Sequence, residues 1–180
     1  MQARVSHMAN SSIFKNRKVA VRQLNHHQEF AILNDFCVQN SDFFDFQSGI
    51  NGHLQAAEEI LTDLPPGKQL TDKSIWGAFE QDRLLAIIEG TADYPEKGIW
   101  YLGLFIIDDS LKKTGFSSEY YHHFETILLP DSADTIRIAV LSGNQTALKF
   151  WLKKGYVEIK RKEKTFGNKT HLLIVMEKEL

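Results

Sequence analysis

The sequence predicts an α+β (α/β) fold in a single domain, because of the order in which strand-like and helix-like segments follow one another. Residues 74–79, 84–91 and 98–107 are rich in aromatic and β-branched side chains, and turn-forming residues separate them. We therefore interpret these three segments as strands joined by hairpins. After residue 115 the chain alternates between helical spacing and short apolar runs, which predicts helices between strands.

The N-terminal third of the chain predicts one strand and two helices. Residues 17–24 alternate between polar and apolar side chains, which is the period of a half-buried strand. Asn25 suits a helix N-cap, and apolar residues follow it at helical spacing. A second helix is expected over residues 51–64, where Pro65 stops it. Residues 41–52 mix turn-forming side chains with phenylalanines and are expected to form a loop.

The C-terminal part of the chain predicts two helices and three strands. Helices are expected over residues 115–129 and 144–154, with a strand over residues 135–141 between them. Two closing strands are expected near residues 156–162 and 171–178. The basic run KRKEK falls where the hairpin between these last strands should turn, so we interpret it as a solvated face.

Composition and charge argue against two classes of partner. The chain has 180 residues, of which 43% are hydrophobic and 24% charged, as in an ordinary globular protein. Its 21 Lys and Arg against 23 Asp and Glu give a net charge of -2, which leaves no basic excess for nucleic acid. The apolar runs are shorter than the roughly 20 residues that span a bilayer. Neither nucleic acid nor a membrane is expected as a partner.

The single cysteine and the N-terminal sequence indicate a cytoplasmic protein. Cys37 cannot form an internal disulfide, and the N-terminus lacks the apolar segment of a secretory signal. Residues 1–12 are expected to be a tag or a disordered tail, and the domain is expected over residues 13–180. Cys37 lies on an apolar helical stripe, which favours packing over a role as a nucleophile.

The spacing of histidines gives no indication of a metal site. His26 with His27 and His122 with His123 are adjacent pairs, whereas ligands on one helix face stand three or four residues apart. We therefore expect no bound metal.

A candidate phosphate-binding segment lies between the strand ending at Ile107 and the helix opening at Gly115. Backbone N–H groups at a helix N-terminus are unpaired and carry the positive end of the helix dipole, so they suit a diphosphate. Lys112 and Lys113 add positive charge, and Gly115 lets a phosphate approach closely. From this segment alone, an ordinary strand-to-helix loop with solvated lysines is an equal alternative.

A second pattern lies downstream, over residues 144–156 (NQTALKFWLKKGY). It places Asn144 at a helix start and Gly155 at the helix end. Together with KKTGFS at residues 112–117, it resembles the acyl-CoA signature of the GNAT acetyltransferase superfamily. That signature is (Arg or Gln)-x-x-Gly-x-(Gly or Ala), followed by Asn-x-x-Ala and an aromatic-Gly-aromatic pattern. The resemblance covers residues 19–177.

The resemblance implies a GNAT-like mixed, twisted, mostly antiparallel central sheet of about seven strands, splayed in the middle and flanked by about four helices. In such a fold the pantetheine arm of acetyl-CoA, the implied cosubstrate, lies along an exposed strand edge like an added strand. The residues implied to bind acetyl-CoA are Phe105, Ile106, Ile107, Lys112, Lys113, Thr114, Gly115, Phe116, Ser117, Asn144 and Phe150.

Three positions depart from the family pattern. Lys112 stands where Arg or Gln is usual and Ser117 where Gly or Ala is usual, and both side chains can still contact phosphate. Trp151 stands where many members place a tyrosine that protonates the departing CoA thiolate. An indole N–H can donate a hydrogen bond there but cannot transfer the proton.

Candidate catalytic residues lie on the strands that lead into the expected gap. Glu89 and Tyr101 rank first, and Trp151 is the residue expected at the thiol end. Asp93 and Tyr94 are further candidates, although both suit a turn equally well. Tyr101 equally suits a strand-filling role.

The function implied by the resemblance is transfer of an acetyl group from acetyl-CoA to a primary amine of a small molecule or peptide. The amine would attack directly in a ternary complex, which requires positioning more than a strong base. The alternatives are a non-catalytic acyl-CoA-binding regulatory module, which Trp151 motivates, and a plain interaction domain. The acceptor is left open, as is a homodimer.

Overall fold

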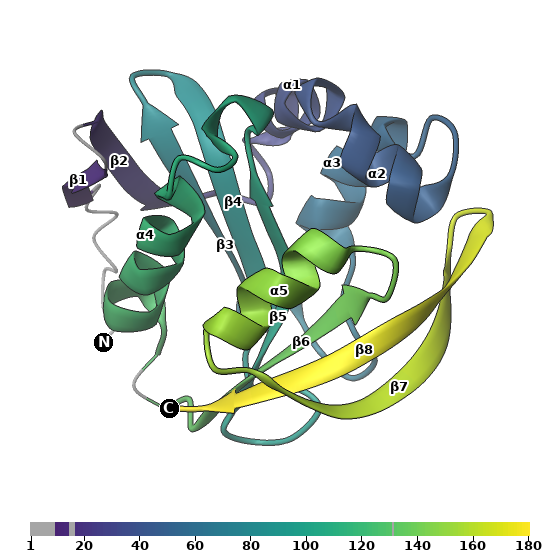
Figure 1. Ribbon diagram of the computed structural model, residues 1–180. Helices are drawn as coiled ribbons and strands as arrows, with labels where there is room; N and C mark the ends of the chain where they lie inside the picture. Colours follow the sequence, from purple (N-terminus) through teal and green to yellow (C-terminus); the bar gives the residue numbers. More distant parts are fainter. Residues whose placement is uncertain (1–9, 15–16, 131) are drawn as a thin grey trace.

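The computed structural model describes residues 10–14, 17–130 and 132–180, and these form one mixed sheet with helices on both faces (Figure 1). The strand order is β1-β2-β3-β4-β5-β6-β8-β7. The strands are β1 (Asn10–Phe14), β2 (Arg17–Gln23), β3 (Lys73–Glu80), β4 (Arg83–Thr91), β5 (Ile99–Ile107), β6 (Thr135–Leu141), β7 (Val157–Phe166) and β8 (Lys169–Glu179).

The helices lie before β3 and on either side of β6. They are α1 (Phe30–Gln39), α2 (Ser41–Ser48), α3 (His53–Thr62), α4 (Phe116–His123) and α5 (Gln145–Lys153). The 3-10 turns η1 (Leu70–Asp72) and η2 (Asp109–Leu111) precede β3 and α4, and the π-helical turn η3 (Phe124–Leu128) continues α4.

The sheet separates two hydrophobic cores, and neighbouring residues of its central strand face opposite layers. In β4, Ile87 packs into the core formed with α1, α2 and α3, whereas Ile88 packs into the core formed with α4 and α5. Both side chains are fully buried. Burial on both faces explains why β4 is a nearly continuous apolar run without polar alternation.

The parallel strands β5 and β6 part after a short paired stretch, which opens the middle of the sheet. Their pairing ends with Leu102 opposite Ile138. Beyond that point β5 stays paired with β4 as far as Ile107, while β6 stays paired with β8 as far as Leu141. The mixed, mostly antiparallel and splayed sheet expected from the family resemblance is therefore confirmed.

A contact between two distant segments closes one side of this divergence. α2 meets the turn between β7 and β8, where the Asn168 N–H donates to the Ser48 carbonyl at 3.2 Å. His171 Nε2 lies 2.8 Å from the Gln47 carbonyl. Figure 1 shows the tip of the β7–β8 hairpin just below α2. The first layer of helices is thereby joined to the last hairpin of the chain.

The expected loop at residues 41–52 is wrong, because most of it forms helix α2 and brings the described α-helices to five. Phe44 is buried among residues of α1 and α3, and Phe43 packs edge-on against it with ring centroids 5.3 Å apart. Burial of these rings outweighs the weak helix propensity of the serine and aspartate residues around them. Local composition does not reveal that tertiary contact.

Two further segments differ from expectation. β1 takes in residues 10–12, which were expected in the tail, and pairs with β2. Residues 1–9 lie outside the described part of the chain. The basic run KRKEK lies inside β7, and the hairpin turns instead at Gly167 and Asn168. Gly167 has a φ of 51°, a backbone conformation that favours glycine.

Replacing Gly90 by alanine should destabilise the fold. A Cβ at this position would lie 2.1 Å from the ring of Trp100, which is itself buried. Overpacking of this kind costs about 1–3 kcal/mol. Urea denaturation followed by tryptophan fluorescence should show a loss of unfolding free energy in that range. Gly143→Ala is the control, since its Cβ would approach only the Phe46 ring, at 3.3 Å. Equal midpoints for the two variants would contradict the expectation.

Candidate active site

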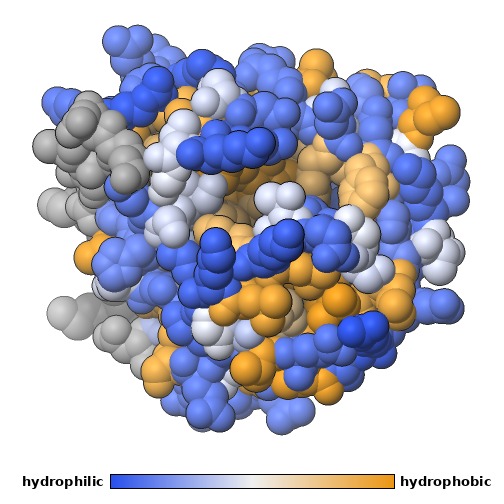
Figure 2. All heavy atoms as spheres, viewed as in Figure 1, coloured by the Kyte–Doolittle hydropathy of each residue, from blue (hydrophilic) through white to orange (hydrophobic). Residues whose placement is uncertain are grey.

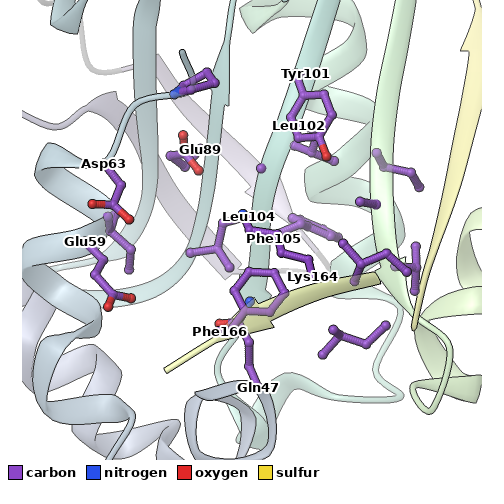
Figure 3. Close-up of a pocket in the computed structure, with 18 of the residues that line it drawn as sticks. Gln47, Glu59, Asp63, Glu89, Tyr101, Leu102, Leu104, Phe105, Lys164 and Phe166 are labelled. Atoms are coloured by element: carbon purple, nitrogen blue, oxygen red, sulfur yellow. The ribbon is translucent and has the colours of Figure 1, made fainter. Parts of the chain in front are cut away.

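A cavity of about 570 Å³ occupies the divergence between β5 and β6. Its walls come from those two strands, from α2, α3 and α5, from β3 and β4, and from the β7–β8 hairpin. Figure 2 shows a hollow near the middle of this face, with apolar side chains inside and polar ones around it. Figure 3 shows that Glu89 of β4, Tyr101 and Phe105 of β5, and Phe166 of β7 line the same space.

The free half of β5 forms one wall of the cavity. Phe105 lines it and stacks on Phe150 of α5 with ring centroids 5.8 Å apart. Ile106 and Ile107 are buried in opposite cores, so only their backbone groups are available to a ligand. Because β6 has diverged from β5 at this point, the edge of β5 after Leu102 has no pairing partner on that side. This is the geometry that an extended ligand needs in order to add as a strand.

The segment before α4 contains two residues with a left-handed backbone. Lys113 has a φ of 63° and Gly115 a φ of 92°. Thr114 N–H donates to the Leu111 carbonyl, and Phe116 N–H donates to Thr114 Oγ1. Among the described residues, no backbone carbonyl accepts a hydrogen bond from the N–H groups of Lys113, Gly115 or Ser117.

The side chains of this segment are engaged with neighbouring residues. Lys112 is largely exposed and forms an ion pair with Asp109, which reduces the positive charge it can offer. Phe116 is buried in the core with Tyr120. Thr114 Oγ1 donates to the Leu111 carbonyl at 2.6 Å and so holds the turn.

Helix α5 begins at the cavity and carries its aromatic wall. Asn144 Oδ1 accepts a hydrogen bond from the Ala147 N–H at 3.0 Å, which caps the helix as expected. One helical turn after Ala147, Trp151 is 6% exposed and lines the cavity. Its ring lies edge-on to Tyr121 and Tyr156, each at a centroid distance of 5.1 Å. Packing on several sides therefore fixes the indole in place.

Glu89 reaches the cavity from β4 and is paired with a buried lysine. Lys73 Nζ lies 3.4 Å from Glu89 Oε1, and the two side chains are 2% and 13% exposed. Burial raises the pKa of Glu89, and the Lys73 ammonium partly offsets that rise. A carboxylate held in this way can accept a proton from a bound group at neutral pH more readily than an exposed glutamate.

Tyr101 also lines the cavity, and its phenol stays protonated. Burial and the neighbouring Tyr94 raise the pKa of Tyr101 to about 12. The two rings pack edge-on with centroids 5.5 Å apart. Tyr94 lines the cavity as well, whereas Asp93 accepts a hydrogen bond from the Gly98 N–H and serves the turn before β5.

The cavity includes charged residues that the sequence patterns did not indicate. Glu59 and Asp63 come from the end of α3, Lys73 begins β3, and Lys162 and Lys164 come from β7. The alternation of lysines in KRKEK indicates a common face, but only the fold shows that this face turns toward the cavity. No sequence signal distinguishes Lys73 from an exposed lysine at a strand end.

Within the described residues, no three His, Cys, Asp or Glu side chains are grouped as metal ligands. No described helix is long and apolar enough to cross a membrane.

The splayed sheet, with an unpaired strand edge along its cavity, is the architecture of GNAT acetyltransferases. The model of the acetyltransferase (GNAT) family matches residues 40–156 of this chain. The chain therefore belongs to this family. Members use acetyl-CoA as cosubstrate. A search among curated proteins gave no match.

Solved structures share the fold at low sequence identity. The GNAT domain of S. lividans PAT is 15% identical with a TM-score of 0.72, covering 97% of this chain and 98% of that one. An acetyltransferase from Thermus thermophilus is 14% identical with a TM-score of 0.69, covering 90% and 97%. The Salmonella typhimurium enzyme that modifies the N-terminal serine of a 50S ribosomal subunit protein is 12% identical with a TM-score of 0.66, covering 93% and 98%.

Cys37 should be unreactive in the folded protein. It is fully buried on α1, and burial raises the pKa of its thiol to about 12. Its thiolate fraction at pH 8 is then about one in ten thousand. A thiol reagent such as DTNB should label it only after urea is added, with one equivalent released. Rapid labelling of the native protein would contradict this expectation.

Proposed function

We propose that this protein transfers an acetyl group from acetyl-CoA to a primary amine of a small molecule or peptide, by direct attack in a ternary complex. The observation that carries the proposal is one continuous cavity in the β5–β6 divergence. It is bordered by the unpaired edge of β5 and reached by the buried carboxylate of Glu89. Cosubstrate and acceptor can therefore meet at Gly103, where β5 leaves β6.

The residues along β5 and before α4 suit acetyl-CoA. The N–H groups of Lys113, Gly115 and Ser117 would hold the diphosphate, with Lys112, Thr114 and Phe116 shaping the turn. The backbone of Phe105, Ile106 and Ile107 would bind the pantetheine amides, and Asn144 with Phe150 would border the same arm. Acetyl-CoA supplies the acetyl group as an activated thioester.

In this proposal Glu89 accepts the proton of the acceptor amine. As the nitrogen bonds to the acetyl carbon and the carbon–sulfur bond breaks, the ammonium proton passes to the Glu89 carboxylate. An N–H on the free edge of β5 would stabilise the charge that develops on the carbonyl oxygen. Positioning of the two reactants in the cavity would supply most of the rate.

Tyr101 and Trp151 contribute hydrogen bonding and shape at the thiol end. A phenol with a pKa near 12 is a weaker acid than a thiol, so Tyr101 would donate a hydrogen bond and keep its proton. The indole of Trp151 likewise donates without releasing a proton. The CoA thiolate would then take its proton from solvent.

A non-catalytic acyl-CoA-binding module is the competing function, and Trp151 is the observation that favours it. Both functions require CoA binding, so turnover separates them. Acetyl-CoA should be incubated with a panel of polyamines, arylalkylamines and peptides with a free N-terminus, and the release of thiol measured. Tight CoA binding with no thiol release over the whole panel would favour the binding module.

Replacing Gly115 by alanine should weaken CoA binding about tenfold, which corresponds to about 1.4 kcal/mol. The added Cβ would crowd the turn that faces the diphosphate, at a φ of 92°. Titration calorimetry with CoA measures the change. Gly155→Ala is the matched control, since it imposes similar strain at a φ of 91° at the far end of α5. Equal affinities in the two variants would reject the diphosphate site.

Replacing Glu89 by glutamine should lower kcat by about 10²-fold or more while leaving CoA affinity unchanged, because the variant lacks the proton acceptor. Since burial raises the pKa of Glu89, activity in the unaltered protein should fall as pH drops through a value above about 4.3, the ordinary glutamate pKa. Thiol release measured against pH gives both results. A kcat retained in the variant would remove Glu89 from the chemistry.

A further inference from the structure

A buried cation on β3 contacts the carboxylate proposed to act as base. Lys73 lies opposite Thr91 in the β3–β4 ladder, and Glu89 lies opposite Ile75. The two side chains are therefore diagonal neighbours on one face of the sheet. Lys73 Nζ is 3.4 Å from Glu89 Oε1, and the Lys73 side chain is almost completely buried.

The lysine is held by a second partner, which prevents it from turning toward solvent. Lys73 Nζ donates to the Asp63 carbonyl at 2.7 Å. Asp63 follows α3 directly, and its own N–H donates to the Glu59 carbonyl, so the acceptor is part of the helix end. The ammonium is thereby fixed between the helical layer and the sheet.

The other oxygen of Glu89 lies above a residue with no side chain. A Cβ at Gly103 would lie 2.6 Å from Glu89 Oε2. The β4–β5 register shifts at this point, since Glu89 opposes Leu104 while the next residue, Gly90, opposes Leu102. Gly103 is the extra residue of that bulge, and it lies where β5 separates from β6.

We propose that Lys73 is a positioning residue for acetyl transfer: it binds Oε1 of Glu89 and so directs Oε2 over Gly103 into the cavity. The proposal rests on the proposed function, in which Glu89 accepts the proton of the amine. Gly103 provides the space that this orientation needs. Lys73 acts through Glu89 and has no contact with the reacting atoms.

The charges around Glu89 explain why a lysine is needed there. Lys73 faces it from β3, the Asp63 carboxylate from the end of α3, and the phenol of Tyr101 from β5. Lys73 is the cation of this group, and Asp63 acts in the opposite sense by disfavouring a second negative charge. Loss of Lys73 would raise the pKa of Glu89 further, because burial would then act without a neighbouring cation to oppose it.

The test compares Lys73→Met with Lys178→Met, a variant at another paired lysine that lies outside the cavity and contacts Glu125. Carbon-13 NMR of labelled glutamate follows the titration of Glu89 without cosubstrate or acceptor. In Lys73→Met the pKa of Glu89 should rise by about one pH unit or more. The pH below which kcat/KM falls should rise by the same amount. In Lys178→Met neither should move.

The two readouts separate the failure of this proposal from failure of the proposed function. An unchanged Glu89 titration in Lys73→Met overturns the role of Lys73. A shifted titration in a protein with no turnover on any amine supports the pairing but rejects Glu89 as a base in catalysis.

Gly103→Ala provides a second test that removes no charge and does not depend on the folding of Lys73→Met. Its Cβ would displace the end of a flexible side chain and meet no backbone there, so the fold should tolerate it. We expect kcat to fall about tenfold. The pKa of Glu89 in Gly103→Ala should stay below its pKa in Lys73→Met, provided that Lys73→Met folds. An unchanged kcat would reject the placement of Oε2 over Gly103.

Discussion

The short pairing between β5 and β6 is the constraint on which the rest of the site depends. A parallel pair that ended later would satisfy the β5 edge with β6 and fill the space that the cavity occupies. Because it ends with Leu102 and Ile138, β5 keeps an unpaired edge that borders the cavity. An unpaired edge presents a row of backbone N–H and C=O groups, so it is suited to a ligand that supplies the missing hydrogen bonds.

Much of this arrangement follows from local sequence, because the elements concerned have strong periodicity. The expected strand over residues 135–141 has the same bounds as β6, and the helix expected from Asn144 has the asparagine as its cap. The glycine at position 115 is the N-cap of α4, at the place where a helix was expected to open. Patterns of this type depend on the neighbouring residues alone and therefore carry over to the fold.

The parts that sequence did not predict are those decided by distant contacts. α2 is a helix because Phe44 finds a core between α1 and α3, which no local pattern shows. Likewise, Lys73 became a buried partner of Glu89 only through the β3–β4 register and the carbonyl of Asp63. Glu89 and Tyr101 both line the cavity, but their roles there stay predictions.

The contact between α2 and the β7–β8 turn affects how the protein folds during its synthesis. β8 lies between β6 and β7 in the sheet, so the C-terminal part of the sheet cannot assemble until residues near the chain end have been synthesised. The contact between Ser48 and Asn168, which closes the cavity wall, joins residues 120 positions apart in the chain. Such long-range closure slows folding. A nascent chain can therefore have formed most of the layer made by α1, α2 and α3 before the cavity exists.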